Sequence, residues 1–168
     1  MTQRVALATV LDRLAIDAVI TGYAVAVDDG AWSDYGALFT PGGRADYRDA
    51  GGVEGPAEEI ARWLGETMRI FPVRQHLIVN RRIDLEDLGG YTGDRAEVLA
   101  DYLNPMCLAR KADNGSDAPG RADSGQAGSP TPDFVTGGRY AFELHRAESG
   151  WLIHKVTVHE KWRRTPDA

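Results

Sequence analysis

Two apolar stripes along the first part of the chain predict a helix over residues 9–27. Apolar residues recur there at steps of three and four, which is the spacing of a helical face. The stripes consist of Val10, Leu11, Leu14 and Ala18, and of Ile16, Ile20, Tyr23 and Val27. Because two stripes make a broad apolar face, we expect this helix to pack against a sheet. A short helix is predicted over residues 31–39, and a third begins at Pro56 and ends before Pro72.

The period of the pattern changes after Pro72, where β-branched and aliphatic residues favour strands. Long strands are predicted over residues 73–85, 95–108, 138–146 and 151–162, and a shorter one over residues 44–48 follows a turn at residues 40–43. Helices that come early and strands that come late are typical of an α+β domain. We expect a curved antiparallel sheet whose concave face is covered by helices, which would enclose a pocket.

Residues 110–137 contain almost no large apolar side chain. A segment of this composition cannot offset its ordering entropy by burial. We therefore predict a flexible loop there, which is a candidate lid over the pocket. The strands after it are too short to build a second core, so we expect one domain over residues 1–168.

The charge balance narrows the classes of partner. The 168 residues include 19 basic and 25 acidic ones, a formal net charge of −6, whereas nucleic-acid-binding proteins usually present a basic face. No stretch has the roughly 18 apolar residues of a membrane span, and the first residues lack the apolar run of a signal peptide. We expect a cytoplasmic protein that binds neither nucleic acid nor a membrane.

The sequence shows no motif for a metal or a phosphate. Its one cysteine, Cys107, excludes an intrachain disulfide and a multi-cysteine metal site. The histidines and carboxylates lack metal-ligand spacing. The glycine pairs at residues 51–52 and 89–90 are not followed by the lysine or helix start of a phosphate loop. We therefore expect no metal site and no phosphate loop.

Six short segments together carry a resemblance to a known family. They are residues 23–32, 38–41, 46–48, 74–80, 102–105 and 137–140. In this order and spacing, the chain resembles the SnoaL-like branch of the NTF2-like (cystatin-like) superfamily and is most similar to the scytalone dehydratase and bile acid 7α-dehydratase branch. The resemblance implies an α+β cone with about three N-terminal helices around a pocket. It also implies a homodimer formed through the convex face of the sheet, and a reaction without metal or organic cofactor.

The resemblance further implies catalytic residues. The dehydratase pattern of two tyrosines, an aspartate and a histidine matches Tyr23, Tyr47, Asp28 and His76. A strand aspartate and a late arginine of the branch match Asp101 and Arg139 more loosely. Histidine exchanges protons near neutral pH, and a carboxylate on its other ring nitrogen, here Asp28 or Asp101, fixes the tautomer. A tyrosine hydroxyl can donate to a developing oxyanion.

The pattern leaves structural alternatives open for the same residues. Tyr23 shares its stripe with core residues, Asp28 can equally be a polar helix end, and Tyr47 can be a cross-strand packing residue. Asp101 faces the pocket if the parity of Leu99 and Leu103 points inward, and it faces solvent if the parity of Val98, Ala100 and Tyr102 does.

A pocket for a flat or polycyclic ligand needs aromatic and apolar walls with a few polar groups. The candidates for ligand contact are Trp32, Phe39, Trp63, Met68, Asn104 and Arg139. Together with these residues, the resemblance implies a cofactor-independent dehydratase or isomerase that acts on a hydrophobic cyclic small molecule, such as a steroid, terpenoid or polyketide. Two alternatives remain: a non-catalytic protein that binds such a ligand, and a dimeric scaffold protein with a filled core.

Overall fold

The computed structural model describes residues 3–86, 94–109 and 131–166. Its helices are α1 (Gln3–Asp29), α2 (Trp32–Ala37) and α3 (Ala57–Thr67), with the 3-10 turns η1 (Arg48–Ala50) and η2 (Met68–Ile70). Its strands are β1 (Phe39–Asp46), β2 (Glu54–Pro56), β3 (Val73–Arg74), β4 (Leu77–Glu86), β5 (Arg95–Cys107), β6 (Phe134–Ala147) and β7 (Gly150–Arg164). The helices precede the long strands, which confirms the predicted α+β class.

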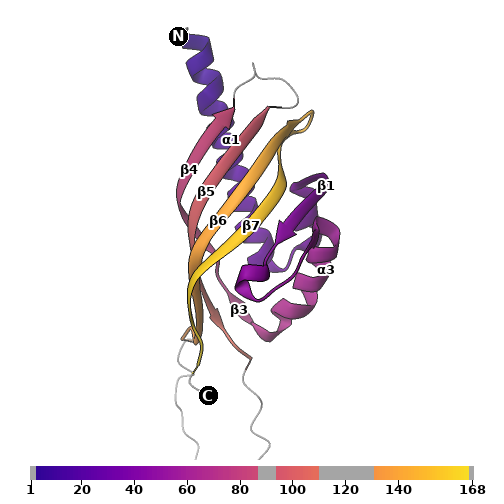
Figure 1. Cartoon of the computed structure of the whole chain (residues 1–168), viewed down its shortest axis with the longest axis vertical. Coiled ribbons are helices and arrows are strands. Elements are labelled where there is room, and N and C mark those ends of the chain that lie inside the picture. Colours follow the sequence, from indigo (N-terminus) through magenta and orange to yellow (C-terminus); the bar gives the residue numbers. More distant parts are fainter. Residues whose placement is uncertain (1–2, 87–93, 110–130, 167–168) are drawn as a thin grey trace, which may run out of the picture.

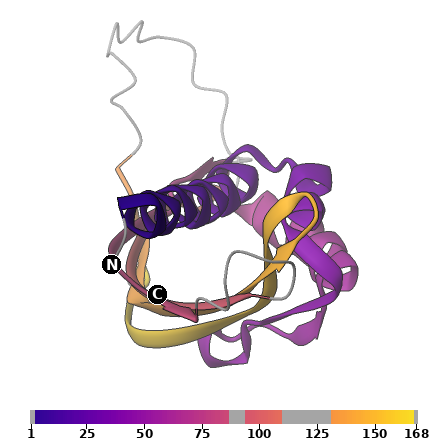
Figure 2. The same ribbon diagram turned by 90° about the horizontal axis from the view of Figure 1, so that it is seen from above.

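The strands of the described residues form one curved, unclosed sheet. Their order is β2-β1-β7-β6-β5-β3, and β4 also pairs with β5. Helix α1 lies across the open side of this curve (Figure 2), while α3 lies near β1 (Figure 1). Strand β1 runs parallel to β7, so the prediction of an antiparallel sheet is wrong for this pair. The residue pattern of a strand records which side is buried but not the direction of its neighbour.

Only one of the two apolar stripes of α1 is buried. The stripe of Ile16, Ile20, Tyr23 and Val27 packs into the core and is at most 3% exposed. Val10, Leu11 and Leu14 are 52–62% exposed, because they lie on the opposite side of a helix whose first turns project beyond the sheet (Figure 1). The expected broad packing face is therefore wrong for the first half of α1. None of the described helices is long and apolar enough to cross a membrane.

Two predicted loop boundaries are wrong. Residues 40–43, predicted as a turn, lie in β1, where the pairing with β7 shifts between Phe39 and Arg44. Residues 134–137, assigned to the flexible loop, begin β6 and pair with β5; a ladder between two neighbours supplies the order that their composition does not. Residues 110–130, which make up most of that loop and hence of the candidate lid, lie outside the described residues.

The strand predicted over residues 73–85 is interrupted in the middle. Strand β3 ends at Arg74 and β4 begins at Leu77, and both pair with β5. Gln75 and His76 lie between the two ladders. The backbone N–H of His76 is thereby available to a side chain.

Candidate active site

A cavity of about 290 Å³ lies between the concave side of the sheet and the helices. Residues of α1, α3, η2, β5, β6 and β7 and the segment between β1 and β2 form its wall. Of the predicted ligand contacts, Trp63, Met68 and Asn104 line it. Small-molecule sites usually measure about 300–1,000 Å³, so this cavity suits a ligand of one or two rings better than a steroid.

Asp28 holds His76 through two hydrogen bonds. His76 Nδ1 donates to Asp28 Oδ1 over 2.6 Å, and the backbone N–H of His76 donates to Asp28 Oδ2 over 2.9 Å. The side chain of His76 is 6% exposed and that of Asp28 is 22% exposed. A carboxylate only accepts, so Nδ1 carries the hydrogen and Nε2 of the neutral ring carries the lone pair. Since His76 lines the cavity, Nε2 is the ring atom left for a ligand.

Two features of the chain bring this pair together. Asp28 lies in the last turn of α1, one residue before its end, where the helix fixes its position. The interruption between β3 and β4 leaves the N–H of His76 outside the ladder, so the carboxylate can accept from backbone and ring together. Of the two carboxylates considered for His76, the structure thus pairs it with Asp28.

A group of three tyrosine hydroxyls lies on the α1 side of the cavity. Tyr23 and Tyr47 both line it, and their hydroxyls are joined by a short hydrogen bond. The hydroxyl of Tyr35, which is fully buried, lies 3.1 Å from that of Tyr47. Burial raises the pKa of Tyr23 and of Tyr47 well above the usual value. Both phenols therefore stay protonated at neutral pH. One of them donates to the other, and the second is left to donate to a ligand oxygen.

Three tyrosines near the site were not predicted as site residues from the sequence: Tyr35, Tyr140 and Tyr102, which also lines the cavity. Tyr35 sits in the short helix α2, and its spacing there is that of any core residue. Tyr140 of β6 lines the cavity and packs edge-on against Tyr23, with ring centroids 5.7 Å apart. Burial raises the pKa of Tyr140 to about 12. Its inward parity on β6 is the one signal that marked it, and that signal is shared by every core residue of the strand.

Asp101 and Arg139 lie on the outer face of the sheet, away from the cavity. Asp101 accepts hydrogen bonds from Arg139 Nε over 2.9 Å and from Lys161 Nζ over 3.2 Å. These bonds, Arg139 first, lower the pKa of the Asp101 carboxyl. The inward parity of β5 is that of Val98, Ala100 and Tyr102. The predicted site roles of Asp101 and Arg139 are therefore not supported, because strand alternation carries both side chains outward.

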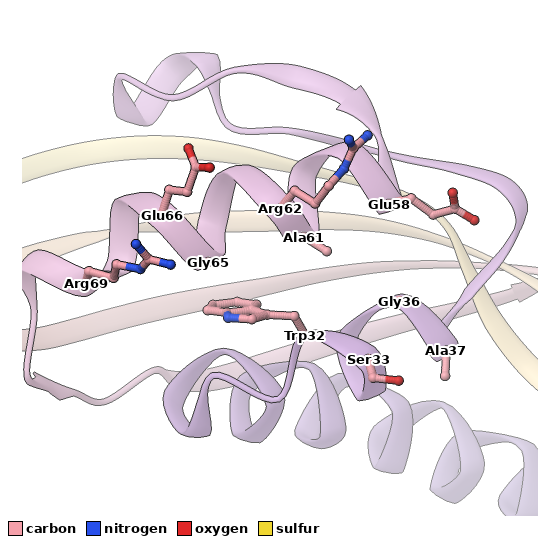
Figure 3. A pocket seen from close by; sticks show the side chains of 10 residues that line it. All are labelled: Trp32, Ser33, Gly36, Ala37, Glu58, Ala61, Arg62, Gly65, Glu66 and Arg69. Atoms are coloured by element: carbon pink, nitrogen blue, oxygen red, sulfur yellow. The ribbon is translucent and has the colours of Figure 1, made fainter.

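Two predicted ligand contacts also lie elsewhere. Phe39 is buried in the core, with its ring centroid 4.9 Å from that of Tyr35. Trp32 lines an open groove of about 730 Å³ between α2 and α3, where its indole packs beside Gly65 (Figure 3). The charged residues of this groove are Glu58, Arg62, Glu66 and Arg69. Neither aromatic residue lines the cavity of His76. Trp32 lies in the groove between α2 and α3, and Phe39 packs against Tyr35 in the core.

The described residues contain no group of three or more histidine, cysteine, aspartate or glutamate side chains placed to hold a metal ion. Their arrangement instead offers a base with a fixed tautomer on one side of the cavity and neutral hydroxyl donors on another. A C–H proton can be moved by such a set without further groups.

Comparison with known families places the chain in one of them. The model of the SnoaL-like domain matches residues 8–157. The chain belongs to the SnoaL-like domain family. The matched residues of this SnoaL-like domain run from α1 into β7 and include His76, Asp28 and the tyrosines of the cavity.

The sequence is also similar to curated proteins from mycobacteria. Uncharacterized proteins of Mycobacterium tuberculosis and Mycobacterium bovis are 32% identical to it over 102 residues, which is 61% of this chain. The match spans 65% of the length of these relatives.

Solved structures of low sequence identity share the fold. A proposed scytalone dehydratase from Novosphingobium aromaticivorans gives a TM-score of 0.72 at 15% identity, over 97% of this chain and 93% of that one. A hexachlorocyclohexane dehydrochlorinase of LinA type 3 from Novosphingobium barchaimii gives 0.69 at 17% identity, over 97% and 94%. A protein from Kribbella flavida gives 0.69 at 18% identity, over 93% and 95%. These likenesses confirm the predicted cone-shaped architecture of the SnoaL-like domain.

Proposed function

We propose that this SnoaL-like domain is a cofactor-independent acid–base enzyme, a dehydratase or isomerase, that acts on a small hydrophobic cyclic molecule. The observation that carries the proposal is the His76 ring, which lines a cavity of about 290 Å³ while Asp28 holds its far nitrogen. An imidazole held in this way is a base whose protonated form is stabilised by the carboxylate.

The proposed reaction begins when His76 Nε2 removes a proton from a ring carbon next to a carbonyl group. Asp28 stabilises the imidazolium that results, and the hydroxyl of Tyr23 or Tyr47 donates to the enolate oxygen. In a dehydration the proton is then returned to a hydroxyl that leaves as water, and in an isomerisation it is returned to another carbon. Each positioned acid or base group contributes about 10²- to 10⁴-fold in rate.

The names of two structural neighbours fit this reaction class. A dehydratase removes water and a dehydrochlorinase removes hydrogen chloride, and both eliminations need a base. These proteins are less than 20% identical to this chain. They support the choice of reaction class, whereas the substrate class is inferred from the size and lining of the cavity.

A non-catalytic binding protein is the second candidate, and the cavity favours it as much as it favours an enzyme. The two differ at His76, because binding alone requires no carboxylate on the far ring nitrogen. A scaffold protein with a filled core is disfavoured by the cavity itself.

The test is elimination of water from 3-hydroxy-1-tetralone, which yields 1-naphthol and is followed by product fluorescence. We expect turnover by the wild type, and a fall in kcat of about 10²-fold or more for His76→Gln and for Asp28→Asn. Asp101→Asn is the matched control, because it removes a carboxylate on the outer face and should keep the wild-type rate.

Equal rates for wild type and His76→Gln would remove the catalytic proposal. If Asp28→Asn kept the wild-type rate and Asp101→Asn lost it, the supporting carboxylate would be Asp101, and the proposed role of Asp28 would be wrong.

A further inference from the structure

Asn104 faces His76 across two neighbouring strands. Arg74 lies opposite Met106 and Leu77 lies opposite Leu103, and the same register between them places His76 opposite Asn104. Side chains opposite each other in an antiparallel pair have Cβ atoms about 4.5–5.5 Å apart. Both residues line the cavity. A ligand atom that meets the His76 ring therefore lies within reach of the Asn104 amide.

One half of that amide is engaged and the other half is not. Asn104 Nδ2 donates to the hydroxyl of Tyr140 over 3.4 Å. Asn104 Oδ1 is buried and has no hydrogen-bond partner among the described residues, and the residue as a whole is 5% exposed. A buried amide oxygen is rarely left without a donor, because the loss of its hydrogen bonds to water is then uncompensated.

The side chains around Asn104 do not supply the donor. Met106, on the same face of β5, has none. The hydroxyl of Thr136, which lies opposite Asn104 on β6, is bonded to Tyr102. Because Asn104 lines the cavity, its Oδ1, which is unpaired among the described residues, is an acceptor in the cavity wall.

We propose, resting on the proposed function, that Asn104 selects a ring substrate that carries a hydroxyl or N–H group close to the carbon on which His76 acts. The donor of the substrate binds Asn104 Oδ1. An amide oxygen cannot protonate a leaving group, so this hydroxyl is a recognition group and Asn104 is a specificity-determining residue. A halogenated hydrocarbon ring has no donor and would leave Oδ1 unpaired, which argues for hydroxylated substrates over halogenated ones.

The test compares three two-ring probes that fit a small cavity. 1-Indanol offers a donor and an acceptor, 1-indanone offers an acceptor only, and indane offers neither. Dissociation constants are measured by protein-observed NMR titration. For the wild type we expect 1-indanol to bind about tenfold more tightly than 1-indanone.

Three variants separate the contact from general effects on the cavity. Asn104→Leu should abolish the preference for 1-indanol. Asn104→Asp keeps an acceptor oxygen and should keep the preference for 1-indanol. Loss of the preference in this variant would contradict the proposal even if the leucine variant fails to fold. Thr136→Val is the matched control, because its hydroxyl is already bonded to Tyr102, and it should keep the preference.

Equal binding of 1-indanol and 1-indanone by the wild type, or binding of neither, overturns the proposal. A preference for 1-indanone that Asn104→Leu removes also overturns it, since the amide N–H₂ would then face the ligand. The readout is affinity, so a protein that prefers 1-indanol without turning over 3-hydroxy-1-tetralone would keep this inference and lose the proposed function.

Discussion

The hydroxyl of Tyr35 reaches the site only through another tyrosine. Tyr35 is fully buried and does not line the cavity, while its partner Tyr47 lines the cavity beside Tyr23. Hydroxyls linked in series polarise one another in a low-dielectric surrounding. Tyr35 is therefore a positioning residue for the pair that faces the ligand.

Two stacked histidine rings outside the cavity make the free energy of unfolding depend on pH. His145 of β6 stacks on His154 of β7, with ring centroids 4.1 Å apart. Burial, then His154 and Arg95, lower the pKa of His145 below its ordinary 6.5, and Glu143 opposes this shift. The folded state thus binds fewer protons at this ring than the unfolded chain does, so stability falls as the pH drops through about 6.5.

The predicted outcome concerns His145→Gln. The free energy of unfolding of the wild type should fall more between pH 7.5 and pH 5.5 than that of the variant, because the variant has no imidazole to protonate at this position. Urea unfolding at both pH values measures the difference. Parallel losses in the two proteins would show that the ring pair has no part in the pH dependence.

At the scale of elements, the site depends on two irregularities in otherwise regular structure. The end of α1 presents Asp28, and the interruption between β3 and β4 presents His76. His76 lies between the two ladders, and its N–H donates to Asp28. The dyad therefore belongs to the junction of the two elements.

The pairing of β6 with β7 relies on a glycine at its register shift. A Cβ at Gly138 would collide with the backbone oxygen of His159 and approach the Tyr102 ring to 2.8 Å. We expect Gly138→Ala to lower the free energy of unfolding by about 2 kcal/mol or more, because backbone cannot yield as a flexible side chain does.

Gly36→Ala is the matched control for this prediction. A Cβ there meets nothing within 4 Å in helix α2, so the change should raise stability by up to about 1 kcal/mol. Urea unfolding followed by tryptophan fluorescence measures both variants. Equal stability of the two alanine variants would contradict the steric argument.

At the scale of the whole molecule, we propose that two copies pair through the outer face of the sheet, as the family resemblance implies. Leu77, Val79 and Leu103 are 38–47% exposed there, and Leu77 lies opposite Leu103. The ion pair of Asp101 and Arg139 lies beside them. An apolar patch with a charged rim is typical of a surface that pairs with a second copy.

The exposed stripe of α1 is the competing surface, and one experiment separates the two. Sedimentation equilibrium should show a dimer for the wild type and for Leu11→Glu, and a monomer for Leu103→Glu, since a buried charge without a partner opposes association. A monomeric wild type would remove the dimer. A monomer for Leu11→Glu alone would move the interface to α1.

Local periodicity was sufficient for the α+β class and for most of the elements, but not for the interruption between β3 and β4 or for residues 40–43 and 134–137. The stripe from Ile16 to Val27, the long strands and the helix after Pro56 follow from spacing, because helices and strands repeat on different periods. Family resemblance then named His76 and Asp28 as candidates, and the structure brings them within 2.6 Å although 48 positions separate them.

Tertiary structure alone decided which side of each strand faces the cavity. Alternation is the same for either face, so the pattern of β5 could not distinguish an inward Asp101 from an outward one. The parallel pairing of β1 with β7, the hydroxyl of Tyr35 near Tyr47, and the unpaired oxygen of Asn104 are likewise contacts between remote segments. They depend on register and packing, which no single stretch of sequence contains.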